Sequence, residues 1–501
     1  MSVKYLKGGS RTVTSELALN VRPYETRLAV IEDNLLVEFY IERKAEPGLV
    51  GNIYRGKVIR VLPGMEAAFV DIGLDKAGFL YVSDVLPNIW DLEGEFDQIS
   101  ISQHYRIETL LQEGQEVLVQ VTREPISTKG PQLSTRITIP GHYLVLLPFF
   151  NYIGISRRIE NETERERLKK IVASSKPENM GFIVRTASEG VEEEKIIYEM
   201  QKLISLWELI LEKKKNTSLP GLVHVELDLC VRTLRDFFGT QTRRLIVDSL
   251  DAYKRLIAYA QEFVPHLQHF IELYQEDQFL FHKLGIENVL PQVLRPQVRL
   301  KSGGYIVIEE TEALVAIDVN TGRFVGENNL EETIVKTNLE AVQEIVRQLR
   351  LRDLGGIIII DFIDMQKESN REKVLGALDK ALKRDRSKTR IFQMSELGLV
   401  EMTRKRTREG LLHSLCESCP YCQGRGYVKS KRTVFYEILS ELEHLHTLKS
   451  KIAIKAHPDL IKYIKQKESV IWKQTISSLK KKIDFIPEPS FHIENYEILE
   501  I

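Results

Sequence analysis

Two carboxylates, each at the end of a short apolar run, are the side chains of this sequence best suited to chemistry. Asp318 closes the apolar part of 312–320, and Asp361 closes that of 355–364. Both runs are β-branched or aliphatic and are bounded by turn residues, which predicts strands. Two strand-end carboxylates that meet in space are a natural site for a hard divalent cation such as Mg2+, which takes oxygen ligands. The pattern therefore indicates chemistry on phosphate groups.

The neighbours of these carboxylates add possible roles. Side chains two apart on a strand share a face, so Asn320 should lie beside Asp318, where its amide can hold a water or a substrate oxygen without adding charge. Asp364 is a rival ligand, but three residues beyond Asp361 on a strand it should face the other way. One alternative is purely structural: Asp318 begins a turn at 320–322, and Asp361 pairs with a nearby arginine.

The segment between the two runs must bring them together. Residues 329–352 have the spacing of a long amphipathic helix that ends at Gly355-Gly356. Its predicted inward side chains are Ile334, Leu339, Val342, Ile345, Val346 and Leu349. A strand-helix-strand unit places both carboxyl ends at one edge of a sheet, which is where ligands bind in open α/β sheets.

Composition limits the class of protein. The chain has 501 residues, 43% hydrophobic and 28% charged, which predicts a globular protein with several cores. With 70 Lys and Arg against 71 Asp and Glu, affinity for a polyanion must come from local patches. Three basic segments flank the acidic strands, and each is either such a patch or a solvated helix face: 347–352, 383–390 and 404–408.

The sequence carries no signal for a membrane or a disulfide framework. Residues 1–12 lack an apolar signal region, and no stretch reaches the roughly 18 uncharged residues that a bilayer requires, so we expect a cytoplasmic protein. Three of the four cysteines lie in 416–422, which favours metal or redox use. Cys230 lies alone in an apolar run and is expected in the core.

A series of short strands separated by Gly and Pro predicts a small closed β-barrel. The strands are expected at 52–62, 66–73, 76–82 and 115–122. Phe69 and Phe79 fall on neighbouring strands, and exposed aromatics of such barrels stack single-stranded bases. The alternative is that both rings belong to the core. The acidic insert Asp91 to Asp97 would repel a polyanion and is expected to loop away from the binding face.

Arg185 and Thr186 follow the apolar run 181–184. A forked guanidinium beside a hydroxyl suits a terminal phosphate. An ordinary surface ion pair at Arg185 is the alternative.

Several motifs together closely resemble the bacterial ribonuclease E/G family. They are Leu314-Val-Ala-Ile-Asp-Val-Asn320, Arg350-Leu-Arg-Asp-Leu-Gly-Gly356, Ile360-Asp-Phe-Ile-Asp-Met365 and Cys419-Pro-Tyr-Cys422. The likeness follows the family's order over nearly the whole chain. Because the chain ends soon after its last small module, it resembles the family's shorter branch, which has no degradosome-scaffolding tail.

The resemblance implies a Mg2+-dependent endoribonuclease, a hydrolase that cuts single-stranded A/U-rich RNA to 5'-phosphate and 3'-hydroxyl ends. It further implies stimulation by a 5'-monophosphate and roles in rRNA maturation and mRNA decay. Asp318 and Asp361 match the family's Mg2+-binding carboxylates, and Asn320 matches the amide that supports the metal-bound water or the scissile phosphate. Other positions match RNA-holding residues of an S1-type barrel (Phe69, Phe79 and Lys129) and a 5'-phosphate sensor (Arg185 and Thr186, with backbone contacts from Gly141 and Val145).

The resemblance also implies a multidomain α/β fold with a β-barrel. An RNase H-like domain (1–42 and 225–293) is split by an S1-type OB-fold barrel (43–135) and the 5'-sensor (136–224). A DNase I-like catalytic domain (294–415), a zinc-link (416–429) and a small dimerisation domain (430–501) follow.

The cysteine motif raises the question of a second metal. Cys419 and Cys422 supply two thiolates, whereas structural zinc takes four ligands. In the family two protomers share the zinc, which implies a homodimer or homotetramer. Cys416 and His413 are the alternative, because their spacing could complete a site within one protomer.

Overall fold

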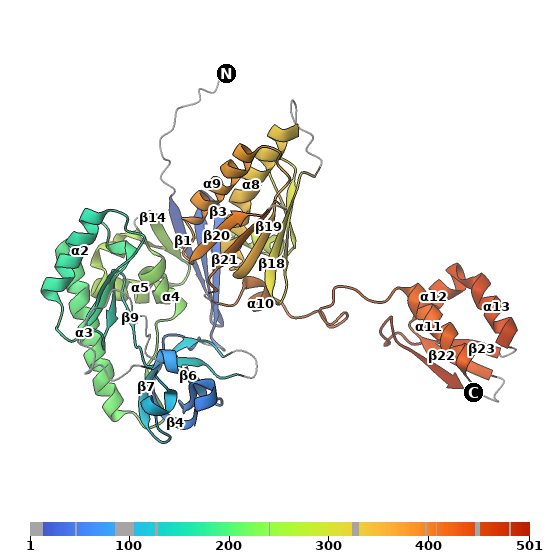
Figure 1. The fold of residues 1–501 in the computed structure, drawn as a ribbon, viewed down its shortest axis with the longest axis horizontal. Coiled ribbons are helices and arrows are strands. Elements are labelled where there is room, and N and C mark those ends of the chain that lie inside the picture. The colour runs from blue at the N-terminus through green and yellow to red at the C-terminus, as the bar shows by residue number, and fades with distance from the viewer. Residues whose placement is uncertain are drawn as a thin grey trace. The chain divides into compact units, whose positions relative to one another are not determined.

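The computed structural model describes residues 14–45, 48–85, 105–125, 129–239, 241–322, 330–395, 398–406, 408–445, 451–479 and 482–501 (Figure 1). The chain divides after Ser414 into two compact units. The acidic insert Asp91 to Asp97 lies outside the described residues. None of the helices described is long and apolar enough to cross a membrane.

The first sheet joins two distant parts of the sequence. Its order is β15 (Ile271–Leu273), β14 (Thr242–Val247), β1 (Ser15–Val21), β2 (Glu25–Glu32) and β3 (Leu35–Arg43). β1 pairs parallel to β14 and antiparallel to β2. The β2-β3 turn is made by Asp33 and Asn34, whose φ angles of 48° and 64° give the left-handed pair that a two-residue hairpin favours. Four helices accompany this sheet: α4 (Leu229–Arg232), α5 (Leu250–Phe263), α6 (Leu280–Lys283) and α7 (Ile286–Val293).

The second sheet is the predicted closed barrel. β4 (Ile53–Leu62), β5 (Ala67–Asp71), β6 (Gly78–Tyr81), β8 (Gln132–Ser134) and β7 (Glu116–Arg123) pair in that order, and β7 returns to β4. The short helix α1 (Ile107–Leu110) precedes β7, and β13 (Gly221–His224) extends the sheet at β4. The sequence did not predict β8, because three residues are too few to show an alternating pattern.

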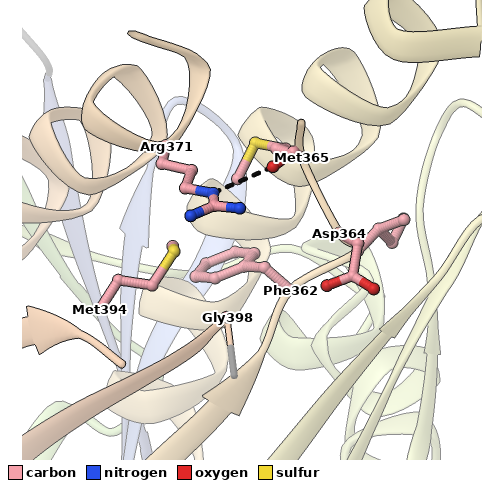
Figure 2. Close-up of a pocket in the computed structure, with 7 residues that line it drawn as sticks. Phe362, Asp364, Met365, Arg371, Met394 and Gly398 are labelled. Atoms are coloured by element: carbon pink, nitrogen blue, oxygen red, sulfur yellow. Dashed lines mark hydrogen bonds between the residues drawn. The ribbon is translucent and has the colours of Figure 1, made fainter. Parts of the chain in front are cut away.

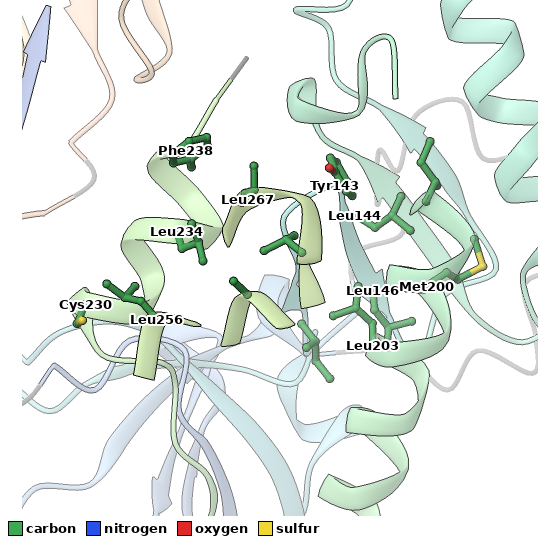
Figure 3. Close-up of a cluster of buried hydrophobic side chains, with 14 of the residues drawn as sticks. Tyr143, Leu144, Leu146, Met200, Leu203, Cys230, Leu234, Phe238, Leu256 and Leu267 are labelled. Atoms are coloured by element: carbon green, nitrogen blue, oxygen red, sulfur yellow. The ribbon is translucent and has the colours of Figure 1, made fainter. Parts of the chain in front are cut away.

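A third sheet shares a core with the first. β11 (Ile153–Ile155), β12 (Gly181–Val184), β10 (Leu144–Leu147) and β9 (Ile139–Pro140) pair in that order, beside α2 (Glu162–Ser175) and α3 (Glu193–Asn216). One hydrophobic cluster joins the side chains of β10 and α3 to those of α4 and α5 (Figure 3). Cys230 lies in this cluster, as predicted, and burial raises the pKa of its thiol to about 12.

The fourth sheet contains the acidic strands. Its order is β16 (Gln297–Arg299), β17 (Tyr305–Glu310), β18 (Leu314–Asn320), β19 (Gly356–Asp361), β21 (Leu399–Arg404) and β20 (Thr389–Met394). α8 (Leu330–Leu351) connects β18 to β19, which pair parallel, and α9 (Glu368–Leu382) follows. The predicted strand-helix-strand unit is therefore confirmed. Val342, Ile345, Val346 and Leu349 of α8 are buried, as expected, while Ile334 and Leu339 are partly buried against the same core.

The end of α8 differs from the prediction. The left-handed residue is Asp353, with φ of 51°, before Gly355-Gly356 is reached. The Leu354 amide donates to the Leu349 carbonyl at 3.0 Å, and the Asp353 amide donates to the Arg350 carbonyl at 3.3 Å. These two bonds form a Schellman motif, in which Asp costs less than most non-glycine residues. The Asp353 carboxylate also accepts a hydrogen bond from Arg404 at 2.8 Å.

Both interpretations of the basic segments were wrong for several of their arginines. Arg350 is only 6% exposed and donates to Glu32 at 2.6 Å and to Glu38 at 2.7 Å, so it joins α8 to the first sheet. Arg404 is 4% exposed and donates to Asp385 at 2.6 Å. These guanidiniums lie inside the protein and link its elements.

The second unit is a small α/β fold. Its sheet has the order β23 (Lys482–Pro487), β22 (Lys451–Ala456) and β24 (Tyr496–Glu500). The helices α11 (Lys431–His444), α12 (Pro458–Lys467) and α13 (Ser469–Leu479) share a core with it, built on Phe435, Ile454, Leu460 and Trp472. The short helix α10 (Leu411–Leu415) lies at the boundary between the two units.

Replacing Arg350 should destabilise the first unit strongly. Burial alone would raise the pKa of Glu38, but the charges of Arg386 and Arg350 outweigh it and hold this pKa below its usual value. Arg350→Met leaves Glu38 buried with one cation fewer, so we expect a loss of about 3–5 kcal/mol in the free energy of unfolding, measured with urea. Lys195→Met, which removes an exposed ion pair with Glu192, is the control and should cost about 1 kcal/mol or less. Equal losses in the two variants would contradict this account.

Candidate active site

The two strand-end carboxylates meet. The parallel register of β18 and β19 pairs Asp318 with Asp361, and neighbouring strands lie about 4.8 Å apart. Both side chains are exposed, whereas Ile317 and Ile360, one residue earlier on each strand, are buried in the core. The predicted meeting of the strand ends is therefore confirmed.

Asn320 lies on the same face as Asp318, as expected. Its Nδ2 donates to Asp318 Oδ2 at 2.8 Å, which orients the carboxylate. Within the described part of the chain, neither Asp318 nor Asp361 forms an ion pair, so the expected alternative of an arginine partner for Asp361 is not observed there.

Negative charge accumulates around Asp361. Burial raises the pKa of its carboxyl, and the charges of Asp318 and then Asp364 raise it further. The prediction that Asp364 faces away assumed a continuing strand. β19 ends at Asp361, so the alternation stops there, and the charge of Asp364 contributes to the raised pKa of Asp361.

The donor set suits a hard dication. Two carboxylates and an amide are oxygen ligands of the kind that Mg2+ takes, and a dication would relieve the repulsion that raises the pKa of Asp361. Over the described ranges, no three His, Cys, Asp or Glu side chains lie close enough to hold a metal ion. The residues that fit Mg2+ are Asp318 and Asp361, assisted by Asn320.

A pocket of about 250 Å3 is lined in part by the residues that follow Asp361 in the sequence (Figure 2). Gly398 lines this pocket, and the next residue, Leu399, pairs with Asp361 across the sheet. The lining combines apolar side chains with a carboxylate and a guanidinium: Phe362, Ile363, Asp364, Met365, Arg371, Met394 and Gly398. Arg371 is held by a hydrogen bond from its Nε to the Met365 carbonyl at 2.9 Å.

The barrel presents an aromatic surface. Phe69 and Phe79 pair across β5 and β6, with ring centroids 5.4 Å apart and edge to face. Val70 and Leu80, which alternate with them, form the barrel core, so the interpretation of the phenylalanines as core residues was wrong. Tyr81 adds a third ring at 4.4 Å from Phe79 and is 43% exposed. The sequence analysis missed it, although its position two residues after Phe79 on one strand was a usable signal.

Basic side chains flank these rings. On one side of the rings, Arg60 of β4 pairs with Phe69 of β5. On the other side, Gln132 of β8 lies between Phe79 of β6 and Arg123 of β7 and pairs with both. Arg60, Arg123 and Lys129 are all exposed. The barrel therefore offers stacking surfaces between cations, as a single-stranded polyanion requires.

The structure brings Arg185 into a polar cluster on the third sheet. Its Nη1 donates to Asp236 Oδ1 at 2.9 Å and to the Gly141 carbonyl. Thr186 shares a hydrogen bond with Ser156, with their hydroxyl oxygens 2.9 Å apart. Val145 lies on β10 and pairs with β12, which ends just before Arg185.

Asp236 is a residue that the sequence analysis missed. It lies in a π-helical turn, Thr233–Phe237, a rare geometry that is frequent at functional sites. Burial would raise the pKa of Asp236, but Arg235 and Arg185 outweigh it and lower this pKa. The expected alternative, an ion pair at Arg185, is thus observed, with a partner held inside the cluster.

The cysteine motif forms a tight turn in the second unit. The Gly426 amide donates to Cys422 Sγ at 3.4 Å, and backbone amides of Cys422 and Tyr421 lower the pKa of Cys419. Amide donors directed at sulfur favour thiolates, so the turn suits two of the four ligands of a zinc ion.

Known proteins resemble this chain over nearly its full length. Residues 138–407 match the sequence profile of the Ribonuclease E/G family, and residues 49–136 match that of the S1 RNA binding domain. The chain is 46% identical to Ribonuclease G of Salmonella typhimurium and 45% identical to Ribonuclease G of Escherichia coli, each over 97% of the chain and 100% of the relative. It is also 41% identical to Ribonuclease E of Nostoc sp., over 75% of the chain and 54% of that protein.

Neutralising Asp361 should stabilise the metal-free protein. A raised pKa means that ionised Asp361 destabilises the fold, a penalty that appears as pH rises through its folded pKa. With a chelator at pH 7.5, Asp361→Asn should therefore raise the thermal midpoint. The gain in the free energy of unfolding should be at most about 1 kcal/mol, because the site is exposed. Mg2+ should raise the midpoint of the wild type but not that of the variant.

Asp379→Asn, at an exposed position on α9, is the matched control. Its midpoint should respond to Mg2+ as the wild type does. A midpoint of Asp361→Asn that rises with Mg2+ as much as the wild type's would contradict a cation site at the carboxylate pair.

Proposed function

The chain belongs to the ribonuclease E/G family and is an endoribonuclease, and from this premise we propose that it hydrolyses single-stranded A/U-rich RNA in a Mg2+-dependent reaction at Asp318 and Asp361. The products have 5'-phosphate and 3'-hydroxyl ends. The observation that carries the proposal is the in-register pairing of these two carboxylates at the ends of parallel strands.

The residues of the site have separate roles. Asp318 and Asp361 hold the cation, and Asn320 orients Asp318 through the hydrogen bond at 2.8 Å. Mg2+ held there would lower the pKa of a water, polarise the phosphoryl oxygen and neutralise the negative charge that develops on the leaving 3'-oxygen. Because both carboxylates lie on paired strands of one sheet, their separation is fixed before RNA arrives.

RNA reaches this site as a single strand. The closed barrel and the S1 profile match fit an OB-fold, and Phe69, Phe79 and Tyr81 are positioned to stack bases that a duplex would keep paired. Exposed Lys129 binds the backbone phosphates. The chain is thus an RNA-binding protein whose cleavage requires unpaired bases.

Arg185 and Thr186 bind the 5'-monophosphate, with backbone contacts from Gly141 and Val145. A phosphate arriving here competes with Asp236 for the Arg185 guanidinium, so the cluster favours a dianionic 5'-phosphate over a neutral 5'-hydroxyl. This discrimination accounts for stimulation by a 5'-monophosphate. The roles in rRNA maturation and mRNA decay follow the family resemblance.

The sheets support a finer domain assignment. The strand order β15-β14-β1-β2-β3, built from both sides of the barrel and sensor, supports an RNase H-like domain split between 1–42 and 225–293. The six-stranded sheet within 294–415 supports a DNase I-like catalytic domain.

A zinc ion shared by Cys419 and Cys422 of two protomers links them into a homodimer, which can pair again into a tetramer. Native mass spectrometry before and after chelation tests this link. Loss of zinc with dissociation supports it, and loss of zinc without a change of oligomer contradicts it. Cys416→Ser should keep both zinc and dimer if the site is shared, and should lose zinc if one protomer completes the site.

Removing either carboxylate should abolish cleavage without loss of RNA affinity. Asp318→Asn and Asp361→Asn should each lower kcat about 100-fold or more, because each removes a group that holds the cation. The cleavage rates are measured on matched RNA and DNA oligonucleotides with 5'-hydroxyl or 5'-monophosphate ends. Equal cleavage of RNA and DNA, or wild-type rates in the variants, would refute the proposal.

Truncating the aromatic surface should weaken binding. Phe69→Ala and Phe79→Ala should each cost about 1–3 kcal/mol of affinity for single-stranded RNA, because each removes a stacking surface. Fluorescence anisotropy measures the loss. Tyr24→Ala, which removes a tyrosine that is 67% exposed outside the barrel, should leave affinity unchanged. Equal affinities for all three variants would show that bases do not stack on this face.

A further inference from the structure

A buried carboxylate lies beneath the loop that leads into β10. Glu199, on α3, is 1% exposed and accepts hydrogen bonds from three consecutive backbone amides. The donors are the amides of His142 at 2.6 Å, Tyr143 at 2.7 Å and Leu144 at 2.8 Å. Successive amides that converge on one anion form a nest, a strong and strictly oriented arrangement.

The same carboxylate explains a glycine in the loop. A Cβ built at Gly141 would lie 2.7 Å from Glu199 Cδ and 2.8 Å from Glu199 Oε2. Gly141 has no left-handed φ, so the close approach of the carboxylate is what requires glycine there. Loop and carboxylate are therefore fitted to each other.

This loop in turn holds Arg185 at two points. The Arg185 amide donates to the Tyr143 carbonyl at 2.8 Å, and its guanidinium donates to the Gly141 carbonyl. Ser188 Oγ also donates to the Tyr143 carbonyl, at 2.8 Å. A change in the path of the loop would therefore move the Arg185 guanidinium, which we propose binds the terminal phosphate.

A carboxylate in this place is costly. Its neighbours on α3 that face the core are Ile196, Met200 and Leu203. Burial raises the pKa of Glu199 to about 7, even though the three amides and Arg185 act in the opposite direction. An apolar side chain would fill the core at lower cost but would leave three buried amides without an acceptor.

We propose that Glu199 is the positioning residue of the 5'-phosphate site: it fixes the loop 141–143 and the start of β10, and through them Arg185, in the geometry that binds a terminal phosphate dianion. This inference rests on the proposed function of Arg185 and Thr186. Glu199 itself does not touch the RNA.

The readout is the ratio of kcat/KM for a 5'-monophosphorylated RNA oligonucleotide to kcat/KM for the same oligonucleotide with a 5'-hydroxyl. Glu199→Gln keeps the shape of the side chain but replaces an oxygen acceptor with a donor, so at least one amide of the nest loses its partner. The ratio should fall about tenfold, through KM for the phosphorylated substrate, while cleavage of the 5'-hydroxyl substrate stays at the wild-type rate. Glu208→Gln, at an exposed position on the same helix, should leave the ratio unchanged.

An equal fall for both substrates would show that Glu199 is merely structural and would overturn the inference. So would an unchanged ratio in Glu199→Gln while the wild type is stimulated by the 5'-phosphate. A wild type indifferent to the 5'-phosphate would overturn the sensor and this inference together.

A second pair of variants tests the contact even if Glu199→Gln fails to fold. Gly141→Ala should lower the ratio, because its Cβ meets the Glu199 carboxylate. In the double variant Gly141→Ala, Glu199→Asp, the side chain at position 199 is shorter by one methylene. The carboxylate then leaves room for the new Cβ, and part of the kcat/KM ratio should be restored. Failure of the double variant to recover would overturn the role of Glu199.

Discussion

The parallel, in-register pairing of β18 with β19 is the constraint on which the proposed active site depends. It places two like charges side by side where each would be more stable alone. Burial of the hydrophobic core beneath the two carboxylates offsets this repulsion. In that core Ile317, Ile358 and Ile360 are essentially inaccessible to solvent. A parallel pair also needs a crossover, and α8 supplies it. Arg350 forms ion pairs with Glu32 of β2 and Glu38 of β3, so the crossover helix between the two carboxylates is anchored to a different sheet.

Local sequence pattern was sufficient for the elements that have a clear period. The acidic strands, the helix between them and the face shared by Asp318 and Asn320 follow from alternation and helical spacing. Strand β8 could not be predicted, because it is too short to show an alternating pattern. The helix between the acidic strands ends within one residue of its predicted end, but the left-handed residue that follows it is Asp353, whose contact with Arg404 the local sequence does not show.

The groups that hold the sites in place were invisible for a different reason. Arg350 and Glu38 are 312 positions apart in the chain, and His142 and Glu199 are 57 apart. The basic segments were therefore predicted to be surface patches or solvated helix faces, and nothing in the local sequence distinguished Glu199. Asp318 and Asp361 could be found because the strand ends expose them, whereas Glu199 and Asp236 act through partners that only the fold brings near.

The strand order of the first sheet has a consequence for folding during synthesis on the ribosome. Its central strand β1 must pair with β14, and Ser15 and Thr242 are 227 positions apart. At about 5 to 20 residues per second, the ribosome needs roughly 10 to 50 s to deliver the missing strand. During that interval the nascent β1-β2-β3 meander presents an open edge of Leu17, Ala18 and Leu19 backbone, the kind of edge that recruits foreign strands. The inserted barrel and third sheet thus delay the closure of the sheet that flanks them, and until β14 is made this edge stays open to pairing with other chains.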